Sequence, residues 1–278
     1  MSQQTQCSVP SDLDLALRMA DAADEITRRA FRSADLVVET KADRTPVSEA
    51  DRAVEAELRS ILATDSPGDR VVGEEYGDTG SGPRRWIVDP IDGTKNFVRR
   101  IPVWATLIAL EVEGTVSVGV VSAPALGRRW WAALGFGAYV TDLAGGAPEA
   151  MRVSSVASLA DAHLSGSALS SWDDWGGPDG YVALAQRCYA DRSFGDFWSH
   201  MLVAEGVLDI GIDPIASLWD LAALEVIVLE AGGSFTNLAG SRGPGGGSAI
   251  STNGLLHDEA LSVLGRSPSA ASPPPPTS

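Results

Sequence analysis

The most informative stretch of the 278-residue chain is Trp86-Ile-Val-Asp89-Pro-Ile-Asp92-Gly-Thr94-Lys-Asn-Phe97. Its apolar start predicts a buried strand that runs into Asp89, and Pro90 is expected to end the hydrogen-bonding ladder there. Asp92-Gly93 is typical of a turn, so the carboxylates of Asp89 and Asp92 could point into one small volume. The polar residues after the turn offer backbone N–H groups, a hydroxyl and a cation to an anion. An isolated motif of this kind is most often a surface turn, so a functional interpretation needs support from elsewhere in the chain.

Further acidic residues supply that support. Glu74 follows another apolar strand end, the place where α/β sheets usually carry their chemistry. Asp220 opens a predicted helix over 221–230, where an acid is also favoured simply as a helix N-terminal residue. Four carboxylates in one cleft, from Glu74, Asp89, Asp92 and Asp220, would repel one another unless divalent cations neutralised them. Oxygen ligands suit Mg²⁺, Mn²⁺ or Ca²⁺, and no Cys or His spacing indicates zinc.

The charge balance leads to the same metal hypothesis. The chain has 21 Lys+Arg and 37 Asp+Glu, a net charge of 21 − 37 = −16, and a pI near 4.5. Such a protein is not expected to bind nucleic acid or an anionic membrane, because both need a basic face. No apolar run approaches the ~18 residues of a membrane span and the N-terminus is not signal-like, so we expect a cytoplasmic location. An acidic protein that handles an acidic substrate must obtain positive charge locally, and bound divalent cations would supply it.

The chain is expected to form one compact unit over residues 11–265, with two halves that meet near 145–150. Residues 1–10 are expected to be a loose N-terminal segment, and the proline-rich residues 266–278 a disordered tail. Hydrophobic periodicity indicates an α+β protein of layered helices and sheets. The predicted helices begin at Ser11 and Ser48 and cover 181–188, 197–205 and 221–230. The predicted strands are 71–72, 86–88, 104–111, 116–122, 130–133, 163–167, 207–212 and 248–251.

Three motifs, in their order along the chain, resemble the inositol monophosphatase superfamily of Mg²⁺-dependent phosphatases. They are Gly73-Glu74-Glu75, Asp89-Pro-Ile-Asp92-Gly-Thr94, and Trp219-Asp220 followed by Glu230-Ala-Gly-Gly233. The resemblance covers about residues 12–265 and implies an alternating αβαβα layered fold and a homodimer. It also implies two or three Mg²⁺ ions, the first held by Glu74, Asp89 and the Ile91 carbonyl, and the second by Asp89, Asp92 and Asp220.

The same resemblance implies which residues act on the phosphate. Glu74 and the Asp51–Thr94 pair would activate the attacking water, and the phosphate would lie against the backbone of residues 92–95. Asp51 also has a structural explanation, because Ser48 and Asp51 have the spacing of a capping box. Lys41 matches a family position near the metals, although a lone lysine in a loop is by default merely solvated.

Substrate specificity would come from the second half of the chain. Asp196 follows the small-residue turn 193–195 and could either cap the next helix or face a cationic group on the substrate. Asp213 stands where many inositol phosphatases carry Glu, and aromatic residues beside Asp196 would also suit a cation. His163 and His200 belong to no motif and are expected to be structural. The expected substrate contacts are Asp92, Gly93, Thr94, Lys95, Arg192, Gly195, Asp196, Asp213 and Asp220.

Within the superfamily, the sequence most resembles the histidinol-phosphate phosphatases of bacteria. The similar stretches are 86–99, 118–126 with 128–131, and 252–257, and Lys95 stands where inositol enzymes often have Thr. We therefore predict hydrolysis of L-histidinol phosphate, in histidine biosynthesis, by metal-activated water and without a phosphoenzyme. One alternative is another small substrate: inositol monophosphate, a sugar phosphate, or 3′-phosphoadenosine 5′-phosphate, which is disfavoured because no second basic cluster is found. The other alternative is a non-catalytic sensor of metal or phosphate.

Overall fold

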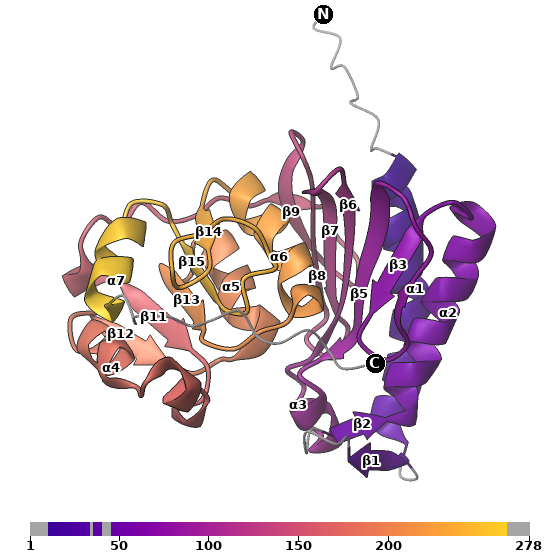
Figure 1. Ribbon diagram of the computed structural model, residues 1–278, viewed down its shortest axis with the longest axis horizontal. Helices are drawn as coiled ribbons and strands as arrows, with labels where there is room; N and C mark the ends of the chain where they lie inside the picture. Colours follow the sequence, from indigo (N-terminus) through magenta and orange to yellow (C-terminus); the bar gives the residue numbers. More distant parts are fainter. Residues whose placement is uncertain (1–10, 34–35, 41–45, 266–278) are drawn as a thin grey trace, which may run out of the picture.

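A computed structural model describes residues 11–33, 36–40 and 46–265 of the protein. Layers of helix and sheet alternate along the molecule, from α1 (Ser11–Arg32) and α2 (Glu49–Asp65) on one side to α4 (Asp179–Ala185) and α7 (His257–Leu264) on the other (Figure 1). This is the αβαβα arrangement that the family resemblance implies. The segments 1–10 and 266–278, predicted to be loose, lie outside the described residues. None of the described helices is long and apolar enough to cross a membrane.

The first half of the chain forms an eight-stranded sheet in the order β10-β9-β8-β7-β6-β5-β3-β4. Neighbouring strands are antiparallel except β3 and β5, which are parallel. A small hairpin, β1 (Val38–Thr40) and β2 (Pro46–Ser48), precedes this sheet in the sequence. The strands of the sheet are β3 (Arg70–Gly73), β4 (Gly77–Thr79), β5 (Arg84–Asp92), β6 (Ala105–Val112), β7 (Thr115–Ala123), β8 (Arg128–Ala133), β9 (Gly137–Asp142) and β10 (Glu149–Ala150).

Both faces of this sheet are buried, because successive side chains of its strands enter two different apolar layers. On β6, Leu107 faces α6 (Leu218–Glu230), whereas Ile108 faces α1 (Ser11–Arg32) and α2 (Glu49–Asp65). A strand buried on both faces has an almost continuous apolar sequence, which is why β6 could be recognised from its composition.

The second half forms a five-stranded sheet in the order β12-β11-β13-β15-β14. Helices α5 and α6 fill the space between the two sheets, and α4 and α7 cover the outer face of the second sheet (Figure 1). The strands are β11 (His163–Gly166), β12 (Ala190–Arg192), β13 (Ile210–Asp213), β14 (Ser234–Thr236) and β15 (Ala249–Thr252). The further helices are α3 (Thr94–Val98), α4 (Asp179–Ala185), α5 (Asp196–Ala204) and α7 (His257–Leu264).

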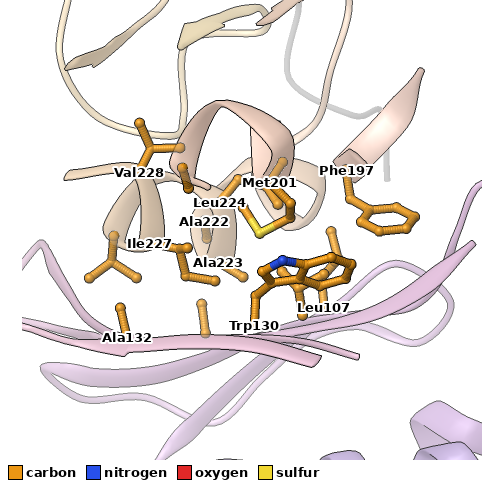
Figure 2. Packing of buried hydrophobic residues seen from close by; sticks show 14 of the residues in the cluster. Leu107, Trp130, Ala132, Phe197, Met201, Ala222, Ala223, Leu224, Ile227 and Val228 are labelled. Atoms are coloured by element: carbon orange, nitrogen blue, oxygen red, sulfur yellow. The ribbon is translucent and has the colours of Figure 1, made fainter. Parts of the chain in front are cut away.

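The layer between the sheets is an extensive apolar core (Figure 2). Trp130 of β8 is fully buried there with Met201 of α5, and its indole Nε1 donates to the Glu205 carboxylate at 2.6 Å. Residues 221–228 of α6 are all buried, because a helix enclosed between two sheets must be apolar on nearly every side. This enclosure gives a fixed support to Asp220, which lies in the first turn of α6.

Most of the predicted elements are confirmed, but Pro90 does not end its strand. β5 continues to Asp92 through a register shift between Asp89 and Asp92. Its Pro90 carbonyl accepts a hydrogen bond from Thr106 Oγ1 at 2.8 Å. The prediction was wrong because a proline interrupts a ladder only where its missing N–H is needed, and a bulge removes that need.

Several element boundaries also differ from those predicted. α4 ends at Ala185 rather than at 188, and β13 begins only at Ile210. α6 begins at Leu218, so Asp220 lies inside its first turn. Short elements escaped prediction because they have too few residues for a periodic pattern. They are β1, β2, β4, β9, β10, β12, β14 and the 3₁₀ turns Leu159–Asp161 and Leu169–Trp175.

Candidate metal centre and active site

The bulge at the end of β5 brings Asp89 and Asp92 to one side of the strand end. Asp89 is buried, and its Oδ1 accepts the backbone N–H of Ile91 at 3.0 Å. Gly93 follows with a φ of +81° and precedes α3. A side chain there would be strained, and its Cβ would lie 3.0 Å from the Val103 carbonyl and 3.3 Å from Asp196 Oδ2. The backbone can therefore turn at this point only because the residue is glycine.

Asp220 joins these two acids from the first turn of α6. Its Oδ2 accepts the backbone N–H of Ser217 at 2.6 Å as part of a capping box. Asp89, Asp92 and Asp220 each offer a carboxylate oxygen, and these atoms all lie within 4.8 Å of one another. The structural and the functional interpretation of Asp220 are thus compatible, since one oxygen caps the helix while the carboxylate belongs to the acidic group.

In the absence of cations, burial and mutual repulsion disfavour the ionised form of these three carboxylates. Burial, followed by the charges of Glu74 and Asp92, raises the pKa of Asp89 well above its ordinary value. Burial, followed by the charge of Asp196, does the same to the pKa of Asp92. The pKa of Asp220 is raised to about 6, again mainly by burial. An all-oxygen donor set with this excess of negative charge fits a hard divalent cation such as Mg²⁺.

Glu74 lies beside this group without belonging to its most compact part. Its charge raises the pKa of Asp51, Asp89 and Asp220, which places it near all three. Among the described residues, the set of carboxylate oxygens within 4.8 Å of one another contains no atom of Glu74. Lys41, the other residue expected near this centre, lies outside the described residues.

Asp51 and Thr94, which the family resemblance pairs, are in contact. Asp51 Oδ2 accepts the backbone N–H of Ser48 at 2.8 Å, which completes a capping box at the start of α2. Its other oxygen, Oδ1, lies 3.3 Å from Thr94 Oγ1, and this hydroxyl also lies 2.9 Å from the Ile91 carbonyl. The capping box is thus confirmed, and it leaves Oδ1 of Asp51 in contact with Thr94. Burial is the main cause that raises the pKa of Asp51.

Asp196 lies next to the acidic group, but it does not cap α5. The N-cap is Gly195, so the capping interpretation of Asp196 is wrong. Asp196 has a φ of +49°, an uncommon conformation for a residue other than glycine, and such outliers cluster at functional sites. Its Oδ2 accepts from Asn96 Nδ2 at 3.3 Å. Burial and the charge of Asp213 raise the pKa of Asp196 to about 6, against the opposing charge of Lys95.

Asp213 is held by two residues that the sequence did not connect with it. Its Oδ1 accepts the hydroxyl of Ser167, and its Oδ2 lies 2.8 Å from His200 Nε2. His200 is fully buried, and its Nδ1 lies 2.8 Å from the hydroxyl of Ser251. His200 is therefore structural, as predicted, but it also fixes the orientation of a predicted substrate contact.

The two remaining basic residues of the predicted site are exposed. Lys95 lies in α3, directly after Thr94, and Arg192 ends β12 with its guanidinium donating to the Asp191 carbonyl at 2.6 Å. A further contact joins the two halves, since the backbone N–H of Phe197 donates to Asp92 Oδ2 at 2.8 Å. This contact brings the start of α5, with Asp196, against the end of β5.

A separate cavity of about 890 Å³ lies between α6, β14 and α7 and contains none of the predicted site residues. His257 lines it, but both ring nitrogens of His257 are bonded, to the hydroxyls of Thr236 at 3.0 Å and Thr252 at 3.1 Å. The acidic group, rather than this cavity, combines buried charge with converging polar atoms, so it is the stronger candidate for chemistry.

Comparison with known proteins decides the family. The model of the inositol monophosphatase family matches residues 11–268. The chain belongs to this family. Members of the inositol monophosphatase family are metal-dependent, in keeping with the acidic group described above.

The family relatives cover almost the whole chain. A histidinol-phosphatase of Mycobacterium tuberculosis (strain ATCC 25618 / H37Rv) is 56% identical over 91% of this chain and 97% of its own. A histidinol-phosphatase of Streptomyces coelicolor is 52% identical over 91% of this chain and 96% of its own. Among solved structures, the extragenic suppressor protein suhB of Bartonella henselae superposes with a TM-score of 0.83 at 27% identity, over 92% of this chain and 99% of its own.

Proposed function

We propose that this protein is a Mg²⁺-dependent phosphomonoesterase that hydrolyses L-histidinol phosphate to L-histidinol and phosphate, a step of histidine biosynthesis. The observation that carries the proposal is the convergence of Asp89, Asp92 and Asp220 within 4.8 Å beside the Asp51–Thr94 pair. Relatives that are more than half identical over most of the chain and carry the name histidinol-phosphatase support the choice of substrate.

The residues of the acidic group would hold two or three Mg²⁺ ions. Glu74, Asp89 and the Ile91 carbonyl would bind the first, and Asp89, Asp92 and Asp220 the second. Such ions, when bound, lower the pKa of a water ligand and neutralise charge on the phosphate. The backbone of Gly93, Thr94 and Lys95 would hold the phosphate oxygens.

The chain's own residues would handle the protons of the reaction. The Thr94 hydroxyl lies between two acceptors, Asp51 Oδ1 and the Ile91 carbonyl, so its oxygen can accept a hydrogen bond from the attacking water. As Thr94 Oγ1 takes a proton from that water, its own hydrogen would pass to Asp51 Oδ1, and the raised pKa of Asp51 makes this carboxylate a better base. The water oxygen would then bond to phosphorus in line while the P–O ester bond breaks. The leaving oxygen takes a proton from solvent and departs as the alcohol, Asp51 returns its proton to solvent, and no covalent enzyme intermediate forms.

The cationic leaving group would face the acids of the second half. Histidinol carries an ammonium and an imidazole, whereas inositol offers only hydroxyls. Asp196 and Asp213 supply negative charge there, and Phe194 and Trp198 form an edge-to-face pair with ring centroids 5.2 Å apart close by. Arg192 and Gly195 complete the proposed substrate contacts.

Phosphate release from histidinol phosphate and from myo-inositol 1-phosphate, each with Mg²⁺ and with EDTA, tests the proposal. We expect Mg²⁺-dependent release and a preference for histidinol phosphate of about 100-fold in kcat/KM, or about 2.7 kcal/mol of differential transition-state binding. Equal or reversed preference would contradict the assignment of histidinol phosphate as the substrate, but it would leave the proposed metal-dependent mechanism intact. A protein that binds Mg²⁺ and releases no phosphate from any monoester would be a sensor instead.

We also propose that the protein is a cytoplasmic homodimer without a nucleic-acid or membrane partner. The family resemblance supports the dimer, and the net charge of −16 supports the absence of anionic partners. Light scattering at micromolar concentration gives the mass directly, and a value near 29.0 kDa, that of one chain, would contradict the dimer.

A further inference from the structure

The loop that carries Glu74 is held by a buried carboxylate of α2 that belongs to no predicted motif. Glu55 Oε2 accepts the backbone N–H of Glu75 at 2.7 Å, and its Oε1 accepts that of Tyr76 at 3.1 Å. The two N–H groups bonded by Glu55 are thus those of the two residues directly after Glu74. The Glu55 side chain is fully buried, so the chain retains an expensive buried charge at this point.

Arg59 pairs with the Glu55 carboxylate and also binds residues farther along the same loop. Its Nε donates to Glu55 Oε1 at 2.8 Å, one helical turn along α2. Its two terminal nitrogens donate to the Gly77 carbonyl and to the hydroxyl of Thr79 at 2.7 Å. Together, Glu55 and Arg59 bind residues 75, 76, 77 and 79, which lead from the Glu74 loop into β4.

The Glu55 carboxylate can occupy its position only because residue 73 is glycine. A methyl group on residue 73 would overlap the carboxylate of Glu55, so the chain needs glycine immediately before Glu74 for this contact to form. The Gly-Glu-Glu motif thus has two physical tasks: its first residue makes room for Glu55, and its second presents a carboxylate toward the acidic group.

α2 consequently supports both parts of the proposed water-activating apparatus. Asp51 at the start of the helix contacts Thr94, and Glu55, four residues later on the same helical face, fixes the loop of Glu74. We propose that Glu55, assisted by Arg59, is a positioning residue that sets the place of Glu74 and thereby the affinity of the site for its divalent cations. This inference rests on the proposed function, because it takes Glu74 to be a metal ligand.

Titration calorimetry of the full-length protein with Mn²⁺, a calorimetrically convenient substitute for Mg²⁺, tests the inference. We expect Glu55→Gln to weaken Mn²⁺ binding by about 10-fold or more, because removal of a group that orients a metal ligand typically costs about 10- to 100-fold. Glu55→Asp keeps the charge but is one methylene too short for both N–H groups, so it should weaken binding similarly. The concentration of Mg²⁺ that gives half-maximal phosphate release should rise in parallel.

Glu111→Gln is the matched control. Glu111 of β6 is also a buried glutamate paired with an arginine, Arg85, at 2.7 Å, but Arg85 lies at the opposite end of β5 from Asp92. We expect this variant to lower the melting temperature of the metal-free protein and to leave the Mn²⁺ affinity unchanged. Glu55→Gln with wild-type affinity would overturn the positioning role, as would full recovery of affinity in Glu55→Asp.

Two further results keep the inference and the proposed function distinguishable. If the Glu55 variants do not fold, Gly73→Ala tests the same contact from the other side, and it should also weaken Mn²⁺ binding; wild-type affinity in that variant would overturn the inference. A wild-type protein that binds no Mn²⁺ would refute the proposed metal centre itself, whatever the behaviour of the variants.

Discussion

Replacing Asp220 by Asn should make the metal-free protein more stable while it abolishes activity. In the folded protein, burial raises the pKa of Asp220 to about 6 from an ordinary value of 3.8. A raised pKa means that the folded state favours the protonated acid. The stability that Asp220 contributes is therefore present below pH 3.8 and is lost as the pH rises through about 6. At pH 7.5 the ionised group destabilises the fold, and a neutral amide removes that cost.

The magnitude follows from the same pKa. The difference between 3.8 and about 6 corresponds to about 3 kcal/mol, at about 1.4 kcal/mol per pH unit. Asparagine keeps an acceptor oxygen for the N–H of Ser217, so the capping box survives. Because the neighbouring acids readjust their own protonation, we expect a net gain of about 1–3 kcal/mol, or about 2–10 °C in melting temperature for a chain of this size.

Calorimetric melting in EDTA and in Mg²⁺ is the assay. Without metal the Asp220→Asn variant should melt above the wild type. With Mg²⁺ the order should reverse, because a ligand that binds only the folded state stabilises in proportion to its affinity. Glu57→Gln, on the exposed face of α2, is the control and should change neither comparison. An Asp220→Asn variant that melts lower than the wild type in EDTA would refute the reasoning that repulsion dominates this site.

Three other substitutions have definite expected outcomes. Asp196→Asn should lower kcat/KM for histidinol phosphate by about 10-fold or more and change that for glycerol phosphate far less, since only the first substrate carries a cation for Asp196 to bind. Trp130→Ala should lower the free energy of unfolding, measured with urea, by about 3–5 kcal/mol, because it opens a cavity in the core between the sheets. Burial lowers the pKa of His257 below 6.5, so its contribution to stability is present above pH 6.5 and lost as the pH falls below that value. The loss of unfolding free energy between pH 7 and pH 5 should therefore be smaller in His257→Gln.

Each of these outcomes has a result that would contradict it. Equal losses on both substrates in Asp196→Asn would show that the residue affects the metal centre rather than the leaving group. A cost below about 1 kcal/mol for Trp130→Ala would mean that the core closes around the missing ring. An unchanged pH dependence in His257→Gln would mean that the acid sensitivity arises at other groups.

The sequence predicts the acidic group better than its surroundings. Asp89, Asp92 and Asp220 were recognised because each follows or opens a strongly apolar element, and such elements are predictable from periodicity. The bulge between Asp89 and Asp92 cannot be predicted in this way, because it depends on the pairing of β5 with β6. Pro90 suggested a strand end, and only the tertiary structure shows that the strand passes through it.

The other site features that the sequence does not predict depend on contacts between residues distant in the chain. His200 contacts Asp213 and Ser251, 13 and 51 residues away, and nothing local to any of the three reveals that arrangement. Glu55 is different, because its spacing of four from Asp51 and from Arg59 on a predicted helix was visible. That spacing predicts a shared helical face, but not that this face meets the loop of Glu74.

The proposed metal ligands Asp89 and Asp92 and the proposed contacts to the leaving group lie on different sheets. Asp89 and Asp92 end a strand of the first sheet, whereas Asp196, Asp213 and Arg192 belong to the second sheet or to the helix packed on it. Under the proposed function, replacements in the second set would change which alcohol is released, because none of these three residues is a proposed metal ligand. New substrate ranges would then be reachable in evolution, or by design, through a small number of replacements between residues 190 and 213, because all the proposed metal ligands lie outside that segment.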